Sequence, residues 1–272
     1  EIGVRLVGSE MCIRDRSSCT NEVDEFIGNV EPSTRSVSTA LNANLASLFT
    51  GGAPTLTSAE IKEVNDAYAK MTSINCYRNI DEAVRNKTSY AGTIFLDDTY
   101  ASAYFRKGSL AFPPYGILAS SMEHEFIHMY QRDVQGKKVD TDKEKRDTGM
   151  MEFELAFYQG IIRYIHAGYS WTFKGEDGDP SYQSLWTSGL TDPSLIPQYE
   201  REFQTYVASI CANGKPTSID INEFVKWSNI FGEYSRGYSG KGYKFGNYDY
   251  GTSCINSCLL YTSPSPRDGL LS

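Results

Sequence analysis

The sequence predicts an α+β fold that is mostly helical, with a small sheet ahead of a long helix near the middle of the chain. Apolar residues recur at helical spacing in several segments, and two short β-type runs lie before the central helix. A chain of 272 residues with 40% hydrophobic residues can bury one large core, alone or with a smaller helical appendage.

The first half of the chain supplies two predicted helices and the sheet. Thr57-Ser58-Ala59-Glu60 has the pattern of a capping box, which predicts a helix beginning there. A second, short helix is predicted over 79–86. The runs Gly92–Leu96 and Ala103–Phe112 predict strands, and the charged middle of the later run is typical of an edge strand. The small sheet therefore precedes the central helix.

The central helix, predicted over Tyr115–Gln135, carries the stretch His124-Glu125-Phe126-Ile127-His128. Helix positions four apart lie about 40° apart around the axis and about 6 Å along it, so His124 and His128 can reach one metal ion. Glu125 lies at the rim of the same site, where it can take a proton from a metal-bound water. The chain has only three histidines, which makes a chance match less frequent. The alternative is two histidines on a surface helix.

A second long helix, predicted over Met150–Ala167, offers a further ligand. A catalytic zinc takes three protein ligands and keeps one position for water. Two carboxylates, Glu152 and Glu154, are candidates, and the helical geometry leaves both open. Glu152 shares its helical face with a small alanine that leaves room for a facing helix. Glu154 lies on an apolar face, where a buried carboxylate needs a strong partner such as a zinc ion.

The stretch Ala111–Phe157 resembles gluzincin-type zinc metallopeptidases, in which a Glu on a later helix completes a His-Glu-x-x-His site. In several such families the later motif is Glu-(Phe/Tyr)-x-Ala-Asp. Glu152-Phe153 matches its start, whereas Leu155-Ala156 replaces the Ala-Asp pair. The resemblance implies a zincin-like domain with Glu152 as the third ligand and Glu154 as the alternative. The missing Asp removes a partner that would orient the metal ligands.

The resemblance also implies an activity, namely hydrolysis of peptide bonds with zinc as cofactor and Glu125 as general base. The expected partner is a peptide or protein substrate, which can pair with the strand Ala103–Phe112 beside the cleft. A tyrosine is the expected oxyanion stabiliser, because His166 lies about 21 Å along the helix from Glu152. The alternative is a catalytically inactive module of the same fold that binds peptide or glycan at the cell surface.

Further helices are predicted over Gln198–Ala212 and Ile221–Tyr234, and Asp220 suits the N-cap of the last one. The segment 171–197 is rich in Gly, Asp, Pro and Ser and is predicted to be an irregular loop. The segment 234–251 is rich in Tyr and Gly and has no clear period.

The predicted domain organisation has one folded unit. Residues 1–16 and 258–272 resemble translated sequencing-adapter reads and are left out of the fold. Residues 17–55 are expected to form an N-terminal exported linker. Residues 56–257 are expected to form the metallopeptidase domain with its C-terminal helices.

Export is predicted from Ser17-Ser18-Cys19 and the acidic residues after it, which resemble the start of a mature bacterial lipoprotein. We expect localisation at the cell envelope or cell surface, with membrane contact only through a lipid on Cys19. The alternative is an ordinary surface cysteine. Cys76, Cys211 and Cys254 can form one disulfide, and its pairing does not follow from the sequence.

Charge and hydropathy bear on the remaining partners. The net charge of −8, without a Lys/Arg patch, argues against nucleic acid or an anionic membrane surface as a partner. No apolar run reaches the ~18 residues that a membrane span needs. We expect a monomer.

Overall fold

The structure is a computed structural model that describes residues 40–52, 54–137, 145–166, 191–210, 219–235 and 239–240. This part of the chain is mostly helical with one small sheet, which confirms the predicted α+β class. The adapter-like ends, Cys19 and most of the segments 171–197 and 234–251 lie outside the described residues. The division of the chain into segments therefore stays a prediction.

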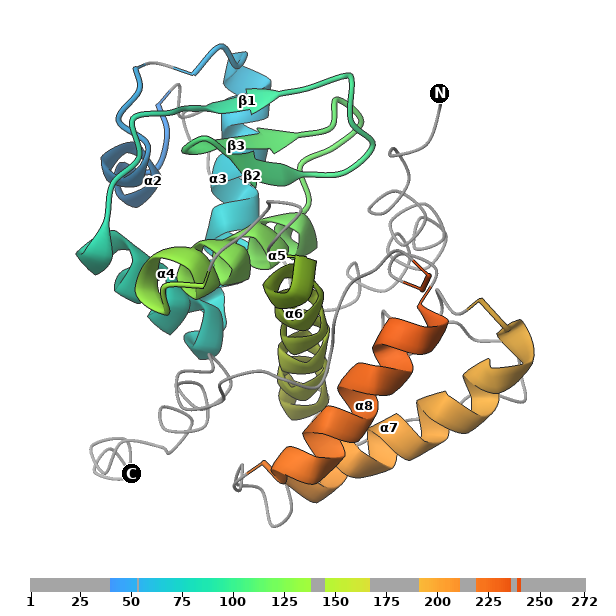
Figure 1. Cartoon of the computed structure of the whole chain (residues 1–272). Coiled ribbons are helices and arrows are strands. Elements are labelled where there is room, and N and C mark those ends of the chain that lie inside the picture. Colours follow the sequence, from blue (N-terminus) through green and yellow to red (C-terminus); the bar gives the residue numbers. More distant parts are fainter. Residues whose placement is uncertain are drawn as a thin grey trace, which may run out of the picture.

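The helix Ala43–Leu48 was not predicted, and the described elements after it follow the predicted order. The sheet lies at one end of the molecule, and α5 lies beneath it (Figure 1). Helix α6 runs from α5 towards α7 and α8. The helices are α2 (Ala43–Leu48), α3 (Ser58–Ser73), α4 (Asn75–Lys87), α5 (Ala119–Met129), the π-helix η3 (Tyr130–Val134), α6 (Lys145–His166), the 3₁₀ turn η5 (Pro193–Leu195), α7 (Ile196–Ile210) and α8 (Ile221–Tyr234).

Two helix starts predicted from local sequence are confirmed. The Thr57 hydroxyl accepts a hydrogen bond from the Glu60 N–H at 3.3 Å, and the Glu60 carboxylate accepts one from the Thr57 N–H at 2.6 Å. Asp220 accepts hydrogen bonds from the N–H groups of Asn222 and Glu223 at the start of α8. These caps satisfy backbone donors that a helix end leaves without partners.

Other helix bounds differ from the prediction. Helix α4 begins at Asn75, earlier than predicted, because Cys76 and Tyr77 extend its buried face. Helix α6 begins at Lys145 rather than Met150, and α7 lies two residues earlier than the predicted range 198–212. The central helix is shorter than predicted, since α5 ends at Met129 and gives way to a wider π-helical turn.

The sheet corrects one prediction. The run Ala103–Phe112 is not a single strand but a hairpin of β2 (Tyr104–Arg106) and β3 (Ser109–Phe112). Its charged middle is the turn, where Lys107 and Gly108 have φ of 51° and 78°. Positive φ at both central residues defines the two-residue turn that matches the strand twist. β1 (Ile94–Leu96) pairs in parallel with β3, so the order is β1-β3-β2 and β2 is an edge strand.

An aromatic core fixes the position of α6. Phe153 and Phe157 of this helix contact Phe224 of α8 at ring-centroid distances of 5.0 and 5.2 Å. Phe157 also contacts Phe203 of α7 at 5.8 Å. Edge-to-face contacts between fully buried rings resist both sliding and rotation of a helix. The core therefore determines which side of α6 faces α5.

Asp81 links α3 to α4 through a buried carboxylate that is only 1% exposed. Its Oδ2 accepts hydrogen bonds from the Tyr68 hydroxyl at 2.8 Å and from Arg85 Nε at 3.0 Å. Burial raises the pKa of the Asp81 carboxyl, and Tyr68 and Arg85 oppose this rise. The carboxylate therefore depends on its two partners.

We expect Asp81→Ala to lower the free energy of unfolding by about 3 kcal/mol, because it leaves the guanidinium and the buried hydroxyl without their acceptor. Asp66→Ala is the matched control, since it breaks an exposed ion pair with Lys62. The side chains of Lys62 and Asp66 are 59% and 63% exposed. That control should cost less than about 1 kcal/mol. Urea unfolding measures both, and equal costs would contradict the role assigned to Asp81.

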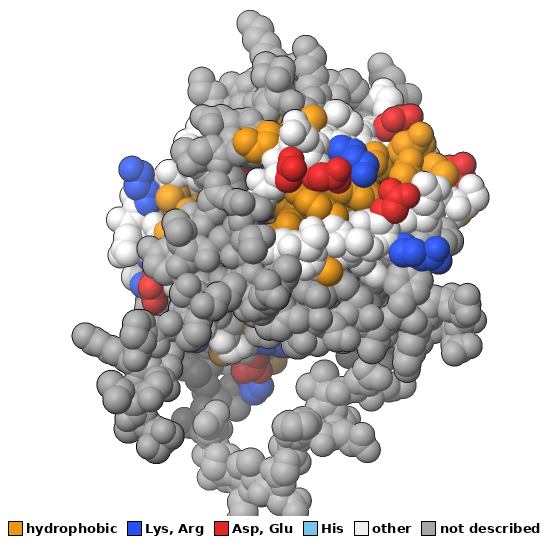
Figure 2. All heavy atoms as spheres, turned by 90° about the horizontal axis from the view of Figure 1, so that it is seen from below, with side chains coloured by type: hydrophobic (Ala, Val, Ile, Leu, Met, Phe, Trp, Pro, Cys, Tyr) orange, Lys and Arg blue, Asp and Glu red, His pale blue; other side chains and the backbone are white. Residues whose placement is uncertain are grey.

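The described residues also bear on membrane association, surface composition and the state of the cysteines. No helix among them combines the length and apolarity of a membrane-spanning segment. On the face seen in Figure 2, hydrophobic side chains lie beside interspersed acidic and basic ones. Cys76 is part of a disulfide, whereas Cys211 and Cys254 lie outside the described residues.

Candidate metal centre

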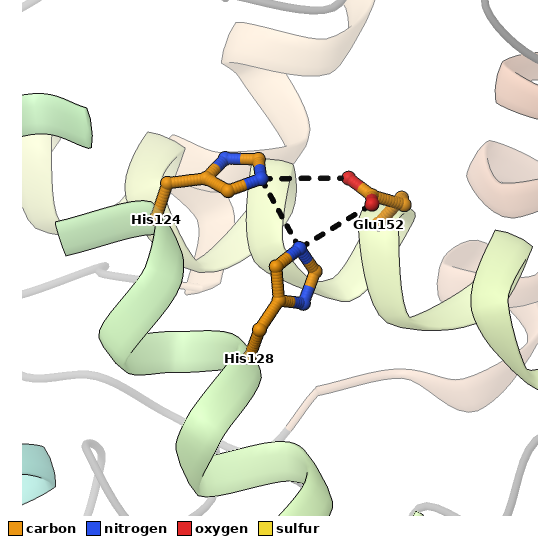
Figure 3. A group of neighbouring side chains, drawn as sticks. All are labelled: His124, His128 and Glu152. Atoms are coloured by element: carbon orange, nitrogen blue, oxygen red, sulfur yellow. Dashed lines mark hydrogen bonds and ion pairs between the residues drawn. The ribbon is translucent and has the colours of Figure 1, made fainter. Parts of the chain in front are cut away.

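Three side chains from two helices converge on one point (Figure 3). His124 and His128 lie one turn apart on α5, and their Nε2 atoms are 3.1 Å apart. Glu152 approaches from α6, with Oε1 3.3 Å from His128 Nε2 and Oε2 3.8 Å from His124 Nε2. One ligand atom from each residue lies within 4.8 Å of the others. This cluster can hold a metal ion.

The electrostatics of the cluster favour a cation between the imidazoles. Two neutral rings that face each other through Nε2 present lone pairs to one another, so they need a proton or a metal ion between them. Burial and the neighbouring His128 lower the pKa of His124 to about 4. Burial also opposes a charge on His128, but the Glu152 carboxylate outweighs it and raises the pKa of His128 to about 9. Glu152 therefore stabilises a positive charge at this position, whether the charge is that of a proton or of a metal ion.

Glu125 lies beside this cluster and is only 6% exposed. Burial raises the pKa of its carboxyl to about 7, and Glu152 adds to the rise. His128 and a hydrogen bond from the backbone N–H of Phe105 in β2 oppose it. A carboxylate with a pKa near neutrality can both accept and return a proton, which is the requirement for general acid–base chemistry.

Of the two carboxylates that the sequence left open, Glu152 is the one that lies against the imidazoles. Glu154 is fully buried, as its apolar helical face suggested, but its partner is an amide. Glu154 Oε2 accepts a hydrogen bond from Gln131 Nε2 at 2.8 Å. Residues two apart on a helix point about 200° apart around the axis, so both cannot face one cluster. His166 ends α6, and its side chain lies outside the described residues.

Sequence reasoning missed the residues that support the cluster. Gln131 lies three positions after His128, a spacing that places both side chains on one helical face. Arg132 lies in η3, and its guanidinium lies 4.3 Å from the ring centroid of Phe105. Arg132 Nε also donates to Asp133 at 2.8 Å, and Asp133 accepts a hydrogen bond from the Tyr90 hydroxyl. These contacts hold β2, and with it the Phe105 N–H, against the site.

Comparisons of the chain with family models, curated proteins and solved structures gave no match. The functional assignment therefore depends on the chemistry of the cluster. Two imidazole nitrogens and a carboxylate oxygen are a ligand set that zinc accepts, and three protein ligands leave a coordination position for water or substrate.

Proposed function

We propose that the protein is a zinc-dependent peptidase with a zincin-like site, in which His124, His128 and Glu152 hold the metal. The observation that carries the proposal is the convergence of their ligand atoms within 4.8 Å, with the buried carboxyl of Glu125 beside them. Zinc, when bound, supplies Lewis acidity that polarises a carbonyl and lowers the pKa of water. A protein with three ligands and an adjacent base has the parts that hydrolysis requires.

Glu125 has the role of general base in this proposal. Its carboxylate takes a proton from the attacking water and later passes it to the leaving amine. Burial raises the pKa of this carboxyl in the metal-free protein, which makes it a better proton acceptor than an exposed glutamate. The Phe105 N–H holds one side of the carboxylate, which limits its rotation away from the centre.

The edge strand β2 supports a peptide as the substrate. Within the described residues β2 pairs only with β3, and Phe105 directs its N–H towards Glu125 on the other side of the strand. An extended peptide can add to an open strand edge through backbone hydrogen bonds. A peptide that added to β2 would lie next to Glu125, so its carbonyl groups would pass the centre.

The disulfide at Cys76 supports the proposal that the protein is exported. Stable disulfides are typical of secreted proteins and of the bacterial periplasm, and they are rare in the reducing cytosol. We propose the cell envelope or cell surface as the location, in line with the lipoprotein-like Ser17-Ser18-Cys19. Mass spectrometry of protein purified from membranes tests this directly, because a lipid on Cys19 changes the mass of the N-terminal peptide.

The function is tested by measuring zinc and hydrolysis together. We expect purified protein to contain about one zinc per chain and to cleave an unstructured protein substrate such as casein. A chelator should abolish cleavage, and added zinc should restore it. His128→Ala should lose both metal and activity. Protein that binds no zinc at neutral pH would overturn the proposal, and zinc binding without cleavage of any peptide in a diverse library would favour the inactive binding module.

A further inference from the structure

A buried hydrogen-bond chain connects His128 to α6 on the side of the ring that faces away from the cluster. His128 Nδ1 lies 2.9 Å from Gln131 Oε1. Gln131 Nε2 donates to the backbone carbonyl of Met151 at 3.0 Å and to Glu154 Oε2 at 2.8 Å. Gln131 and Glu154 are both fully buried. Neither side chain is a ligand in the proposed centre.

The acceptor groups on α6 fix which atoms donate and which accept in this series of hydrogen bonds. A backbone carbonyl accepts hydrogen bonds and cannot donate them, and Glu154 Oε2 accepts from the same amide nitrogen of Gln131. Two such groups, on Met151 and Glu154, face the same amide of Gln131. The amide must therefore turn its NH₂ group towards α6 and its oxygen towards His128. Because that oxygen only accepts, Nδ1 of His128 must carry the hydrogen.

A hydrogen on Nδ1 determines whether the other ring nitrogen, Nε2, has a lone pair for a metal ion. A neutral imidazole with its hydrogen on Nδ1 has its lone pair on Nε2. Nε2 of His128 is the atom that lies 3.3 Å from Glu152 and 3.1 Å from His124 Nε2. The chain from Glu154 through Gln131 thus leaves the metal-binding nitrogen free of hydrogen in the neutral ring. It also holds the ring at both ends, since Glu152 and Gln131 contact opposite nitrogens.

We propose that Gln131, oriented by Glu154 and the Met151 carbonyl, is a positioning residue that fixes the tautomer and orientation of His128 for metal binding. The inference rests on the proposed metal centre. It gives Glu154 a role distinct from that of a spare ligand. Helix α6 then contacts His128 directly through Glu152, and it contacts the same ring indirectly through Glu154 and Gln131. This arrangement supplies the carboxylate support that the replacement of Ala-Asp by Leu155-Ala156 removes from the later motif.

The main test compares Gln131→Met with the wild type. Methionine has a similar length but cannot accept the His128 hydrogen bond in the same way. Removing the hydrogen-bond partner of a metal-ligating histidine typically costs about 10–100-fold in affinity, and we expect a zinc Kd weaker by that factor in competition with a chelating dye. Gln204→Met is the matched control, because it removes a buried glutamine from α7. It should change the zinc Kd less than about threefold.

A second readout needs no metal. In ¹H–¹⁵N spectra of metal-free protein with labelled histidine, we expect a slowly exchanging Nδ1–H signal from His128. That signal should disappear in Gln131→Met and persist in Gln204→Met. If wild-type protein binds no zinc, the proposed function fails, and this signal alone decides the positioning role. A wild type without the signal, or a Gln131→Met variant that keeps both the signal and the wild-type zinc Kd, overturns the inference.

Glu154→Gln keeps the shape of the side chain and serves if Gln131→Met does not fold. A glutamine at this position can donate as well as accept, so the orientation of the Gln131 amide then depends on the Met151 carbonyl alone. We expect zinc binding to weaken by roughly threefold to tenfold, at or below the lower end of the usual range for such partners. The cobalt-substituted protein should show an altered visible absorption spectrum. An unchanged Kd together with an unchanged cobalt spectrum would overturn the role of Glu154.

Discussion

Glu125→Gln is expected to lower the turnover of peptide hydrolysis by about a thousandfold while leaving the zinc content unchanged. General acid–base catalysis by a positioned group contributes roughly 10²–10⁴-fold, and an amide cannot accept the proton from water. The substitution keeps the size of a side chain that is only 6% exposed, so the fold should persist. Steady-state kinetics on a fluorogenic peptide, with metal analysis of the same sample, measures both quantities.

The neighbouring carboxylate provides the control for this prediction. Glu123→Gln makes the same chemical change two positions before Glu125 and one position before the first histidine, and its side chain is partly exposed. It should alter the turnover less than about threefold, because Glu123 is not among the side chains that converge on the centre. If Glu123→Gln lowers turnover as much as Glu125→Gln, or if Glu125→Gln retains wild-type turnover, Glu125 is not the general base.

Local signals explain the parts of the site that the sequence predicted. The spacing of His124 and His128 depends only on the geometry of one helix, so the pair follows directly from the motif. The capping box at Thr57 and the N-cap at Asp220 are equally local, and both were predicted correctly. Features that depend on a few neighbouring residues were therefore accessible without the structure.

The family resemblance favoured Glu152, but helical geometry could not choose between Glu152 and Glu154, because α6 has hardly any exposed face near them. Nearly all side chains from Gly149 to Ile162 are buried, and Glu152 is the exception. Hydrophobic periodicity then does not show which side of α6 faces α5. The orientation of α6 about its axis is set by the packing of Phe153 and Phe157 against α7 and α8, which are distant in the sequence.

The errors in the sheet and the central helix have local causes of a different kind. A two-residue hairpin turn usually carries Asn-Gly or Asp-Gly. The turn here has Lys107-Gly108 instead, so the sequence did not indicate it. The parallel pairing of β1 with β3 joins segments that have no shared sequence signal. The π-helical turn at Tyr130–Val134 continues the helical pattern of α5, so the sequence extends the helix too far.

Glu152→Gln is expected to weaken zinc binding at least about a hundredfold. Zinc sites with four protein ligands bind with roughly 10–16 kcal/mol, so one ligand accounts for on the order of 3 kcal/mol, which corresponds to a factor of more than a hundred. An amide oxygen has no net charge, and it cannot balance the positive charge that a metal ion adds beside His128. Glu154→Gln should lose much less, because Glu154 acts on the metal only through Gln131.

Thermal unfolding with and without zinc distinguishes the two carboxylates. A ligand that binds only the folded state at a hundred times its Kd stabilises it by about 2.7 kcal/mol, whereas a Kd weaker by a hundredfold leaves about 0.4 kcal/mol. Zinc at that concentration should therefore raise the Tm of the wild type and of Glu154→Gln, and barely change that of Glu152→Gln. If zinc stabilises Glu152→Gln and fails to stabilise Glu154→Gln, the third ligand is Glu154, and α6 must rotate on metal binding against the aromatic contacts that fix it here.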